Sequence, residues 1–250
     1  MKAIFLTLGL LLNIAAFGQD SVRAIPDRRN TIKIDLTSHW LYRQAWVVSY
    51  ERVINNRRSW QFTVGYQQFP PISHFGAIAN VTKDINAQGL KLAGEYRFYL
   101  ARENKFAAPH GIYLGPYLSF NNFSNKRDIV VATSSGPEPV SMDSRFDIIN
   151  VGIQLGYQFV FKDRWTIDLS FMGPSISNYR AQFDLSGNYT FNPDDVTNEI
   201  IKDLITRFPG LSDFLSSGSL SKNGKVDTWA YGYRYQIQVG YRFGGKKKSN

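Results

Sequence analysis

The clearest pattern in the chain is a strict alternation of apolar and polar residues near its C-terminal end. Between positions 229 and 243 every odd residue is apolar or aromatic, and the residues between them are small or polar. The apolar row is Trp229, Tyr231, Tyr233, Tyr235, Ile237, Val239, Tyr241 and Phe243. Strict period 2 predicts a β-strand with one apolar and one polar face. Aromatic residues at the ends of such a row suit the two interfaces of a membrane.

Seven segments upstream repeat the pattern. Residues 149–161 and 165–171 are joined by a tight turn and predict a hairpin. The other five segments lie within residues 32–36, 46–51, 60–67, 90–100 and 112–120. An even number of alternating segments is typical of outer-membrane proteins. The sequence therefore predicts an all-β fold, an eight-stranded antiparallel transmembrane β-barrel over residues 30–243.

The N-terminus predicts export. Lys2 is followed by an apolar stretch over residues 3–12 and by the small-residue pattern Ala16-Phe17-Gly18. This order is typical of a secretory signal peptide, here residues 1–18. A membrane anchor is the alternative, but the stretch is interrupted and shorter than the ~20 residues of a spanning helix. Residues 19–29 then form an N-terminal periplasmic segment, and residues 244–250 a basic periplasmic tail.

Composition removes several other classes of protein. The chain has no cysteine, which excludes disulfide scaffolds and cysteine-ligated metal sites. With 43% hydrophobic and 15% aromatic residues it is too apolar for a disordered chain. The net charge of +9 would suggest nucleic acid for a cytosolic protein, but the expected export and the scattered charges argue against that partner. No later segment is apolar for long enough to form a transmembrane helix, so a membrane location requires strands.

The polar faces of the strands favour a membrane barrel over a soluble β-sandwich or lipocalin-like barrel. A soluble sheet could simply expose its polar face to water. Here that face mixes glycine with charge, which suits a narrow lumen, and the opposite face carries long aromatic rows, which suit lipid. The predicted lumen charges are Lys33, Asp35, Glu51, Lys91, Glu95, Arg97, Asp168 and Arg234. We expect them to form a paired network that plugs the barrel; the alternative is a narrow channel for ions or small solutes.

Connection lengths give the predicted orientation. The connections at residues 54–58, 101–110 and 162–164 are modest in length and would be periplasmic. The outward connections at 39–44, 69–88, 121–145 and 173–225 are long, apart from the first. Short periplasmic turns and long outer loops are the asymmetry expected of such barrels.

The fourth outer loop, residues 174–225, carries the one predicted helix. The odd-position pattern continues weakly at its start, through Tyr179, Ala181 and Phe183, which suggests that the hairpin projects beyond the membrane. A helix over about residues 193–208 follows, with an Asn-Pro start and a Pro-Gly stop. Its apolar face is Val196, Ile200, Leu204 and Phe208. This face either packs over the barrel mouth or on the extended hairpin, or it docks another envelope protein.

The last strand also resembles a known assembly signal. Residues 236–243 look like the C-terminal β-signal read by the barrel-assembly machinery, with aromatic residues at Tyr241 and Phe243, although seven residues follow. More widely, a set of strand motifs resembles a family of small exported outer-membrane barrels of unknown function, with OmpA/OmpX-like eight-stranded architecture. These motifs are Tyr50-Glu51-Arg52-Val53, Glu95-Tyr96-Arg97-Phe98-Tyr99-Leu100, Gly111-Ile112-Tyr113-Leu114-Gly115-Pro116-Tyr117, Gly156-Tyr157-Gln158-Phe159 and Trp165-Thr166-Ile167-Asp168. The resemblance implies an outer-membrane location and no established activity.

Candidate catalytic chemistry is sparse. The three histidines, His39, His74 and His110, all fall in connections. None begins the H-x-S motif of outer-membrane lipid A deacylases, and no G-x-S-x-G, H-E-x-x-H or phosphate-binding glycine loop occurs. We therefore expect no enzyme activity, no cofactor and no metal, with a lipid-modifying enzyme as the less favoured alternative. The expected role is structural or interactive, with outer-membrane lipid, the barrel-assembly machinery and another envelope protein as partners.

Overall fold

The computed structural model describes residues 27–68, 74–75, 79–100, 104–133, 136–187 and 225–245. Within these ranges the chain is almost entirely β-strand. The strands are β1 (Asn30–Asp35), β2 (Arg43–Asn55), β3 (Arg58–Gln68), β4 (His74–Phe75), β5 (Ala79–Tyr99), β6 (Gly111–Thr133), β7 (Gly136–Phe161), β8 (Trp165–Met172), β9 (Pro174–Ser186), β10 (Lys225–Tyr233) and β11 (Gln236–Phe243). The predicted signal peptide, the predicted helix over 193–208 and residues 246–250 lie outside the described residues.

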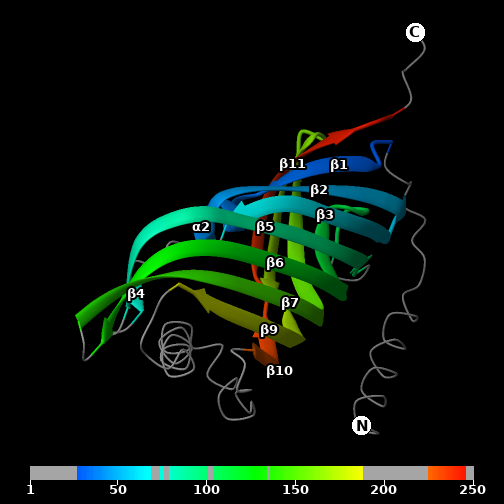
Figure 1. Cartoon of the computed structure of the whole chain (residues 1–250). Helices are drawn as coiled ribbons and strands as arrows, with labels where there is room; N and C mark the ends of the chain where they lie inside the picture. Colours follow the sequence, from blue (N-terminus) through cyan, green and yellow to red (C-terminus); the bar gives the residue numbers. More distant parts are fainter. Residues whose placement is uncertain are drawn as a thin grey trace, which may run out of the picture.

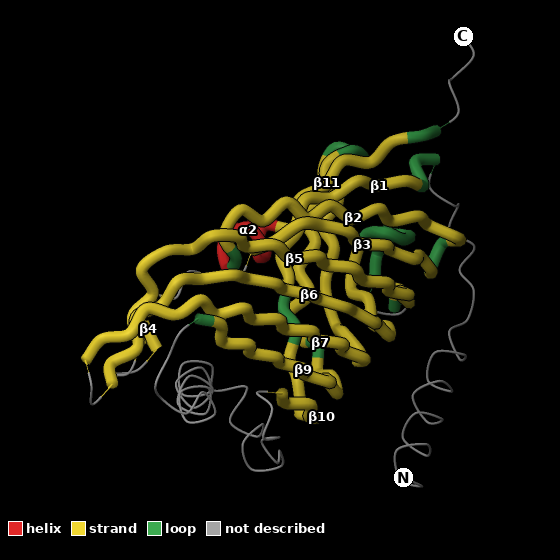
Figure 2. Tube along the Cα trace, viewed as in Figure 1, coloured by secondary structure: helices red, strands yellow, loops and turns green. Residues whose placement is uncertain are grey.

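Eight of the strands close into a ring. Hydrogen-bonded neighbours follow the order β7-β6-β5-β3-β2-β1-β11-β8, and β8 pairs with β7 again, which completes the circle (Figures 1 and 2). The first and last strands meet antiparallel, with Asn30 opposite Phe243 and Ile34 opposite Val239. The other pairings around the ring are antiparallel as well. The predicted all-β fold, the antiparallel pairing and the ring of eight strands are confirmed.

The sheet continues past the ring on one side. There β5, β6 and β7 run on and are joined by β9 and β10 in the order β10-β9-β7-β6-β5 (Figure 1). We call this five-stranded extension the projecting sheet. It occupies residues that we expected in outer loops, so the loop boundaries at 69–88, 121–145 and 174–225 are corrected: β5 begins at Ala79, β6 and β7 are joined through residues 134–135, and β9 fills Pro174–Ser186.

Between β8 and β9 the outward positions switch from odd-numbered to even-numbered residues, which explains why β9 was hard to interpret from its sequence. Phe171 and Met172 are both exposed at the end of β8, and the register opposite β7 shifts at this point. Beyond Gly173 the even residue Ile176 faces outward. The odd residues Ala181 and Phe183 are therefore buried on the inward face, although their row looks like a continuation of the outward one.

The first outward connection contains the short helix α2 (Leu36–Leu41), where the sequence predicted a strand end and a loop. Asp35 caps it, because its side chain accepts a 3.1 Å hydrogen bond from the Ser38 amide. The buried residues of α2 are polar, Thr37 and Ser38, whereas Trp40 is 68% exposed and Leu41 is 47% exposed. The helix thus places polar groups inward and apolar groups outward. In the described part of the chain, no helix is long and apolar enough to cross a membrane.

Candidate functional site

The interior of the ring is charged. All eight predicted lumen residues lie there, and six of them are buried: Lys33, Asp35, Glu51, Glu95, Arg97 and Asp168. The side chains of Lys91 and Arg234 are 14% and 13% exposed. Four carboxylates face four cations, so the formal charges of this set cancel. We call these eight residues the lumen network.

Lys33 is at the centre of the network. Its Nζ lies 2.8 Å from Glu51 Oε2 and 2.5 Å from Asp168 Oδ2. It also donates 2.8 Å hydrogen bonds to the side-chain oxygens of Gln61 and Gln158. Strands β1, β2, β3, β7 and β8 are thereby linked through one ammonium group, and no charge at this point is left without a partner of the opposite sign.

Arg97 extends the network from β5. Its guanidinium binds Glu95 Oε2 at 2.6 Å and Asp168 Oδ2 at 2.5 Å, and it lies 4.3 Å above the ring centre of Tyr113. The Tyr113 hydroxyl donates a 2.7 Å hydrogen bond to the other oxygen of Asp168. Charge-assisted hydrogen bonds of this kind are the strong ones in proteins, and they fix the geometry of both partners.

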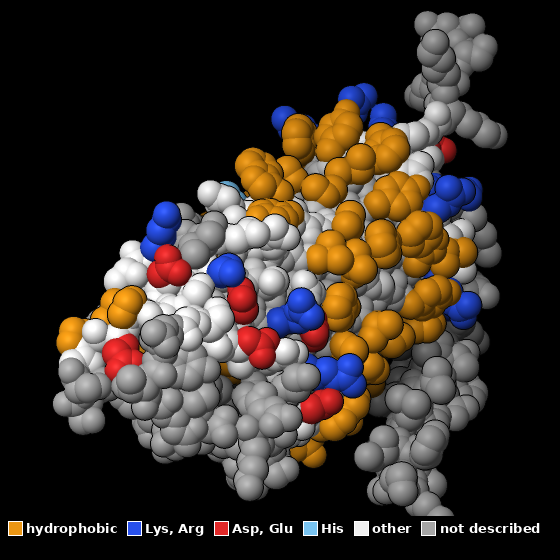
Figure 3. Space-filling model, viewed as in Figure 1, with side chains coloured by type: hydrophobic (Ala, Val, Ile, Leu, Met, Phe, Trp, Pro, Cys, Tyr) orange, Lys and Arg blue, Asp and Glu red, His pale blue; other side chains and the backbone are white. Residues whose placement is uncertain are grey.

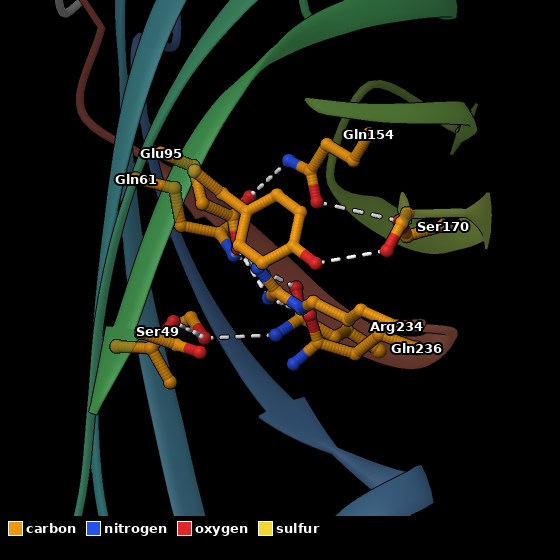
Figure 4. Close-up of polar contacts among 12 residues, drawn as sticks. Ser49, Gln61, Glu95, Gln154, Ser170, Arg234 and Gln236 are labelled. Atoms are coloured by element: carbon orange, nitrogen blue, oxygen red, sulfur yellow. Dashed lines mark hydrogen bonds and ion pairs between the residues drawn. The ribbon is translucent and has the colours of Figure 1, made fainter. Parts of the chain in front are cut away.

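The network continues toward the projecting sheet through two further pairs. Glu95 accepts a hydrogen bond from Arg234 and another from Gln154, the latter at 2.7 Å. Figure 4 shows Gln61 and Glu95 on one wall, Gln154 and Ser170 on another, and Arg234 between them. Asp35 Oδ2 is 2.9 Å from Lys91 and accepts a 2.7 Å hydrogen bond from Gln236.

The opposite end of the ring is closed by an apolar cluster. Val53, Tyr99, Ala108 and Tyr113 pack together and are buried. Ala108 belongs to the connection between β5 and β6, and its amide donates a 2.9 Å hydrogen bond to the Asn56 carbonyl, which draws that connection across the end of the ring. The Tyr99 hydroxyl donates a 2.9 Å hydrogen bond to Glu51, so the apolar cluster joins the lumen network.

Glycines make room for these side chains. A Cβ at Gly156 would lie 2.4 Å from the Tyr113 ring, and one at Gly240 would lie 2.7 Å from Lys33 Cγ. Both distances are too short for a real side chain. The glycines on the polar faces of β7 and β11 are therefore needed because the lumen is filled.

One cavity of about 160 Å³ lies where the lumen meets the projecting sheet. The lumen-network residues Asp35, Lys91 and Arg234 line it, together with hydroxyl and amide side chains and with tyrosines. The rings of Tyr42 and Phe123 stack with 5.4 Å between their centroids. Burial and the nearby Asp35 carboxylate raise the pKa of Tyr42 to about 12. Its hydroxyl therefore stays protonated and can donate a hydrogen bond at any ordinary pH.

The outer surface of the ring is apolar. Figure 3 shows a broad field of hydrophobic side chains over the ring strands and a mixture of polar and charged side chains over the projecting sheet. Exposed members of this field, which we call the apolar belt, include Ile32, Ile34, Trp46, Val48, Trp60, Phe62, Val64, Leu90, Leu118, Val151, Phe161, Trp165, Ile176, Tyr231, Tyr241 and Phe243. A water-soluble protein rarely exposes a contiguous patch of this kind.

The belt ends at a row of polar residues that crosses four strands in register. Asn122 on β6 pairs with Asp147 on β7, Asp147 with Arg180 on β9, and Arg180 with Asp227 on β10. Asn122 donates a 2.6 Å hydrogen bond to Asp147, and Arg180 Nε is 3.0 Å from Asp227. We call these four residues the polar row. Four positions further toward the ring, the corresponding outward row is Leu118, Val151, Ile176 and Tyr231, all exposed.

The projecting sheet reverses the chemistry of the ring. Its inward face is mostly apolar, with Phe123, Ile129, Val131, Val140, Met142, Ala181 and Phe183 buried there, and the polar side chains of Asn125, Arg127 and Ser144 are buried between them. Its outward face carries charged residues such as Lys126, which is 3.8 Å from Asp143, with both side chains about half exposed. This is the arrangement of a sheet in water.

The remaining predicted residues lie apart from the lumen. Tyr241 and Phe243, the predicted assembly signal, face outward at the end of the ring that holds the apolar cluster. The ring centroids of Tyr241 and Trp165 are 5.1 Å apart. His39 lies in α2. His110 lies at the end of the ring opposite α2, where its ring stacks on that of Phe106 with 4.4 Å between the centroids. Burial and the nearby Arg242 guanidinium lower the pKa of His110. Within the described ranges, no group of three or more acidic or histidine side chains could hold a metal ion.

Sequence reasoning missed some lumen partners. Tyr99 lies on the polar face of β5 with Glu95 and Arg97, so the alternation contained its position. Thr37 and Ser38 were missed because the apolar Leu36 extends the alternation of β1, although Asp35 followed by Ser38 is a recognisable helix start.

The fold and the site together define a class: a closed antiparallel ring of eight strands with a charged, filled interior and an apolar exterior. The chain belongs to the family described as "Protein of unknown function (DUF3575)", whose model matches residues 22–191. This match does not point to OmpA or OmpX specifically. Among curated proteins none matches the chain. A similar solved structure is a major outer membrane protein from Thermus thermophilus, with 7% identity and a TM-score of 0.37 over 86% of this chain and 98% of that one.

Proposed function

We propose that this protein is an outer-membrane β-barrel with a plugged lumen, exported by its signal peptide and serving a structural or interactive role at the cell surface. The observation that carries the proposal is the reversal of amphipathicity along continuous strands. The ring is polar inside and apolar outside, whereas the part of the projecting sheet beyond the polar row is mostly apolar inside and polar outside. Only a change of surroundings from lipid to water along the same strand favours both arrangements.

The dimensions of the ring support a membrane-spanning position. The apolar outward stretch of β6 covers residues 112–120, close to the roughly 9–11 residues that a tilted transmembrane strand needs. Closure of the ring pairs β1 with β11 and leaves no free sheet edge there, as a bilayer requires. Trp46, Trp60, Trp165 and Tyr241 are exposed toward the two ends of the belt, where aromatic girdles lie in such barrels.

The packing of the lumen favours a plug over a channel. Arg97 on β5 reaches Asp168 on β8, and Lys33 on β1 reaches Gln158 on β7, so these contacts cross the lumen. The apolar cluster around Ala108 is buried at one end. A narrow eight-stranded barrel is about wide enough for side chains to fill. Ions would have to displace several charge-assisted hydrogen bonds to pass.

Conductance tests the plug directly. Purified wild-type protein inserted into a planar lipid bilayer should show no stable open state, and a general porin added afterwards verifies that the bilayer reports channels. A stable, reproducible open state of the wild-type protein would contradict the plug and support the narrow channel.

The interactive role concerns the fourth outer loop, which the structure describes only at its two ends. We propose that its helix, with the apolar residues Val196, Ile200, Leu204 and Phe208, docks another envelope protein. Deletion of residues 194–217 should leave the heat-shifted gel mobility of the folded barrel unchanged and release a protein that copurifies with the wild type. If every copurifying protein stays bound to the deletion variant, the docking role is wrong.

Assembly supplies the other proposed partners. β11 is the strand that closes the ring against β1, and Tyr241 and Phe243 face outward near its end. We propose that the barrel-assembly machinery binds this strand before closure and that outer-membrane lipid then covers the apolar belt. A catalytic role and a bound cofactor form no part of the proposal.

A further inference from the structure

The cavity described above lies at a seam in the wall of the ring. β1 ends at Asp35, where the chain turns into α2, while the last strand continues from β11 through Tyr235 and Arg234 into β10. The Ile237 amide still donates a 2.8 Å hydrogen bond to Thr37 Oγ1. Beyond this bond, β10 pairs only with β9 among the described residues. Among the described residues, no strand pairing therefore continues the wall between α2 and β10.

The cavity passes through this seam, because residues from both faces of the wall line it. From the outside come Leu41, Tyr233 and Tyr235, which are 47%, 60% and 52% exposed. From the inside come Lys91 and Arg234, whose side chains are largely buried. A ligand in this cavity would therefore lie close to residues of both the outer surface and the lumen.

The depth of the opening matches a membrane interface. Tyr235 and Tyr233 lie eight and ten positions from Phe243 at the closed end, and a tilted strand crosses the hydrocarbon in about 9–11 residues. Trp40 and Tyr231, on the two sides of the seam, are 68% and 80% exposed. Aromatic residues with polar tips gather where hydrocarbon meets headgroups.

The chemistry inside the cavity suits a phosphate. Two cations, Lys91 and Arg234, and one carboxylate, Asp35, line it, and the carboxylate that pairs with Arg234, Glu95, is not among the lining residues. Lys91 uses two of its three donors on Asp35 and Ser38. Within the described residues, Arg234 Nη1 makes no hydrogen bond. Several hydroxyl and amide groups surround these cations: Thr37, Ser38, Tyr42, Ser119, Asn121, Asn150 and Ser175.

The size of the cavity limits what it can hold. A volume of about 160 Å³ is close to the roughly 150 Å³ cavity that holds one benzene molecule. A phosphate with a few further atoms fits this space, and a hydrocarbon chain does not fit beside it. The exposed apolar surface of Leu41, Tyr233 and Tyr235 outside the opening is suited to such a chain.

We propose that the seam cavity binds the phosphate-bearing headgroup of a membrane amphiphile that enters sideways from the bilayer, while its hydrocarbon chain stays against the apolar belt. Cationic pockets in membrane proteins bind anionic headgroups in this way, and Lys and Arg are the usual partners of phosphate. This inference rests on the proposed membrane location and adds a ligand to it.

Calorimetric titration of full-length protein in maltoside micelles tests the proposal. The probes are dodecyl phosphate, dodecylphosphocholine and soluble glycerol 3-phosphate. Dodecyl phosphate should bind at least tenfold more tightly than either of the other two, because it combines a full phosphate charge with a chain. Equal binding of glycerol 3-phosphate would overturn entry from the bilayer, and equal binding of dodecylphosphocholine would overturn selectivity for an anionic headgroup.

Two variants, with a third as a control, test whether the phosphate binds in the cavity. Arg234→Gln removes one cation and should weaken dodecyl phosphate binding roughly tenfold or more, since it removes a charge-assisted contact. Lys126→Gln removes an exposed charge from the projecting sheet and should leave binding unchanged. Ser119→Phe fills the cavity while keeping both cations, and it should also weaken binding, which keeps the test decisive if Arg234→Gln fails to fold. Wild-type affinity in a folded Arg234→Gln or Ser119→Phe variant would overturn the site.

The outcomes separate this inference from the proposed function. A wild-type protein that inserts into lipid vesicles but does not select dodecyl phosphate contradicts the seam site alone. Failure to insert into vesicles contradicts the membrane location itself.

Discussion

The ring and the projecting sheet share three strands, yet they place opposite chemistry on the same faces. Along β6 the inward residues change from Tyr113, Tyr117 and Ser119 in the ring to Phe123, Ile129 and Val131 in the projecting sheet, with the buried Asn125 and Arg127 between them. The outward residues change over the same few positions from Leu118 to Ser124 and Lys126. A single strand therefore has two amphipathic patterns of opposite sense, joined near Asn122.

The difference shows what each region uses for stability. In the lipid surroundings that we propose, the ring gains little from moving apolar side chains inward, which accounts for the polar contacts and charge pairs in its interior. In water the projecting sheet gains from burial of apolar surface, so it has a small conventional core. Because β5, β6 and β7 cross the boundary without a break, we propose that the surroundings rather than the strands set its position.

The largest expected difference in the free energy of unfolding comes from substituting one lysine in each region. Lys33→Met removes the cation shared by Glu51 and Asp168 and should destabilise the ring by about 3–5 kcal/mol, because it leaves buried carboxylates underpaired. Lys126→Met breaks an exposed 3.8 Å pair with Asp143 and should cost about 0–1 kcal/mol. Urea unfolding of each variant in lipid vesicles measures both free energies. Equal costs at the two positions would mean that the lumen network does not hold the ring together.

Next in size is the effect of charge on the outward face. Leu118→Arg puts a guanidinium in the apolar belt and should cost about 2–4 kcal/mol, as expected for a charge facing hydrocarbon. Ser124→Arg, on the same strand and the same face beyond the polar row, should change stability by less than about 0.5 kcal/mol. The same vesicle-based unfolding assay applies. If Leu118→Arg is as well tolerated as Ser124→Arg, the outward face of the ring is in water.

A smaller contrast comes from one methyl group. Ile129 is fully buried in the projecting sheet, so Ile129→Val should cost about 0.5–1.5 kcal/mol through lost packing. Ile32 is 48% exposed on the ring, and Ile32→Val should cost only a few tenths of a kcal/mol. Hydrogen exchange of the β6 amides reports the first change locally. A larger cost for Ile32→Val than for Ile129→Val would reverse the assignment of core and surface.

The smallest effect concerns the polar row. Asp227 is 57% exposed and accepts hydrogen bonds from Arg180 and Asn178, so Asp227→Asn should destabilise the projecting sheet by about 0–1 kcal/mol. Unfolding at low salt and at about 1 M salt measures the charge contribution, which should nearly vanish at the higher ionic strength. A loss that is independent of salt would mean that Asp227 acts through packing.

Period 2 alone predicts the ring and places its lumen charges on one face. The row from Trp229 to Phe243 and the paired row around Gln154 and Gln158 follow this period, because the outer and inner faces of the ring carry contrasting residues on successive positions. The contacts among Lys33, Glu51 and Asp168 could not be predicted, because they depend on strand register and on which rotamers meet across the lumen.

The projecting sheet and the seam could not be predicted from the alternation of apolar and polar residues. The inward row Phe123, Ile129 and Val131 is interrupted by Asn125 and Arg127, so it looks like a polar loop. The parity change at Met172 moves Phe183 to the face opposite to the one the alternation suggests. The seam cavity requires knowing that β1 ends at Asp35 while the last strand continues, and this information lies in the pairing of distant segments.

We propose that β6 passes from lipid into water at the polar row. Because the chain has no cysteine, single cysteines can carry a spin label without background. Labels at Leu118→Cys and Ser124→Cys, in protein reconstituted into vesicles, should differ in their collisions with oxygen, which concentrates in hydrocarbon, and with a water-soluble nickel chelate. We predict a high ratio of oxygen to nickel accessibility at position 118 and a low ratio at position 124. Equal, water-like accessibility at both positions would contradict the account.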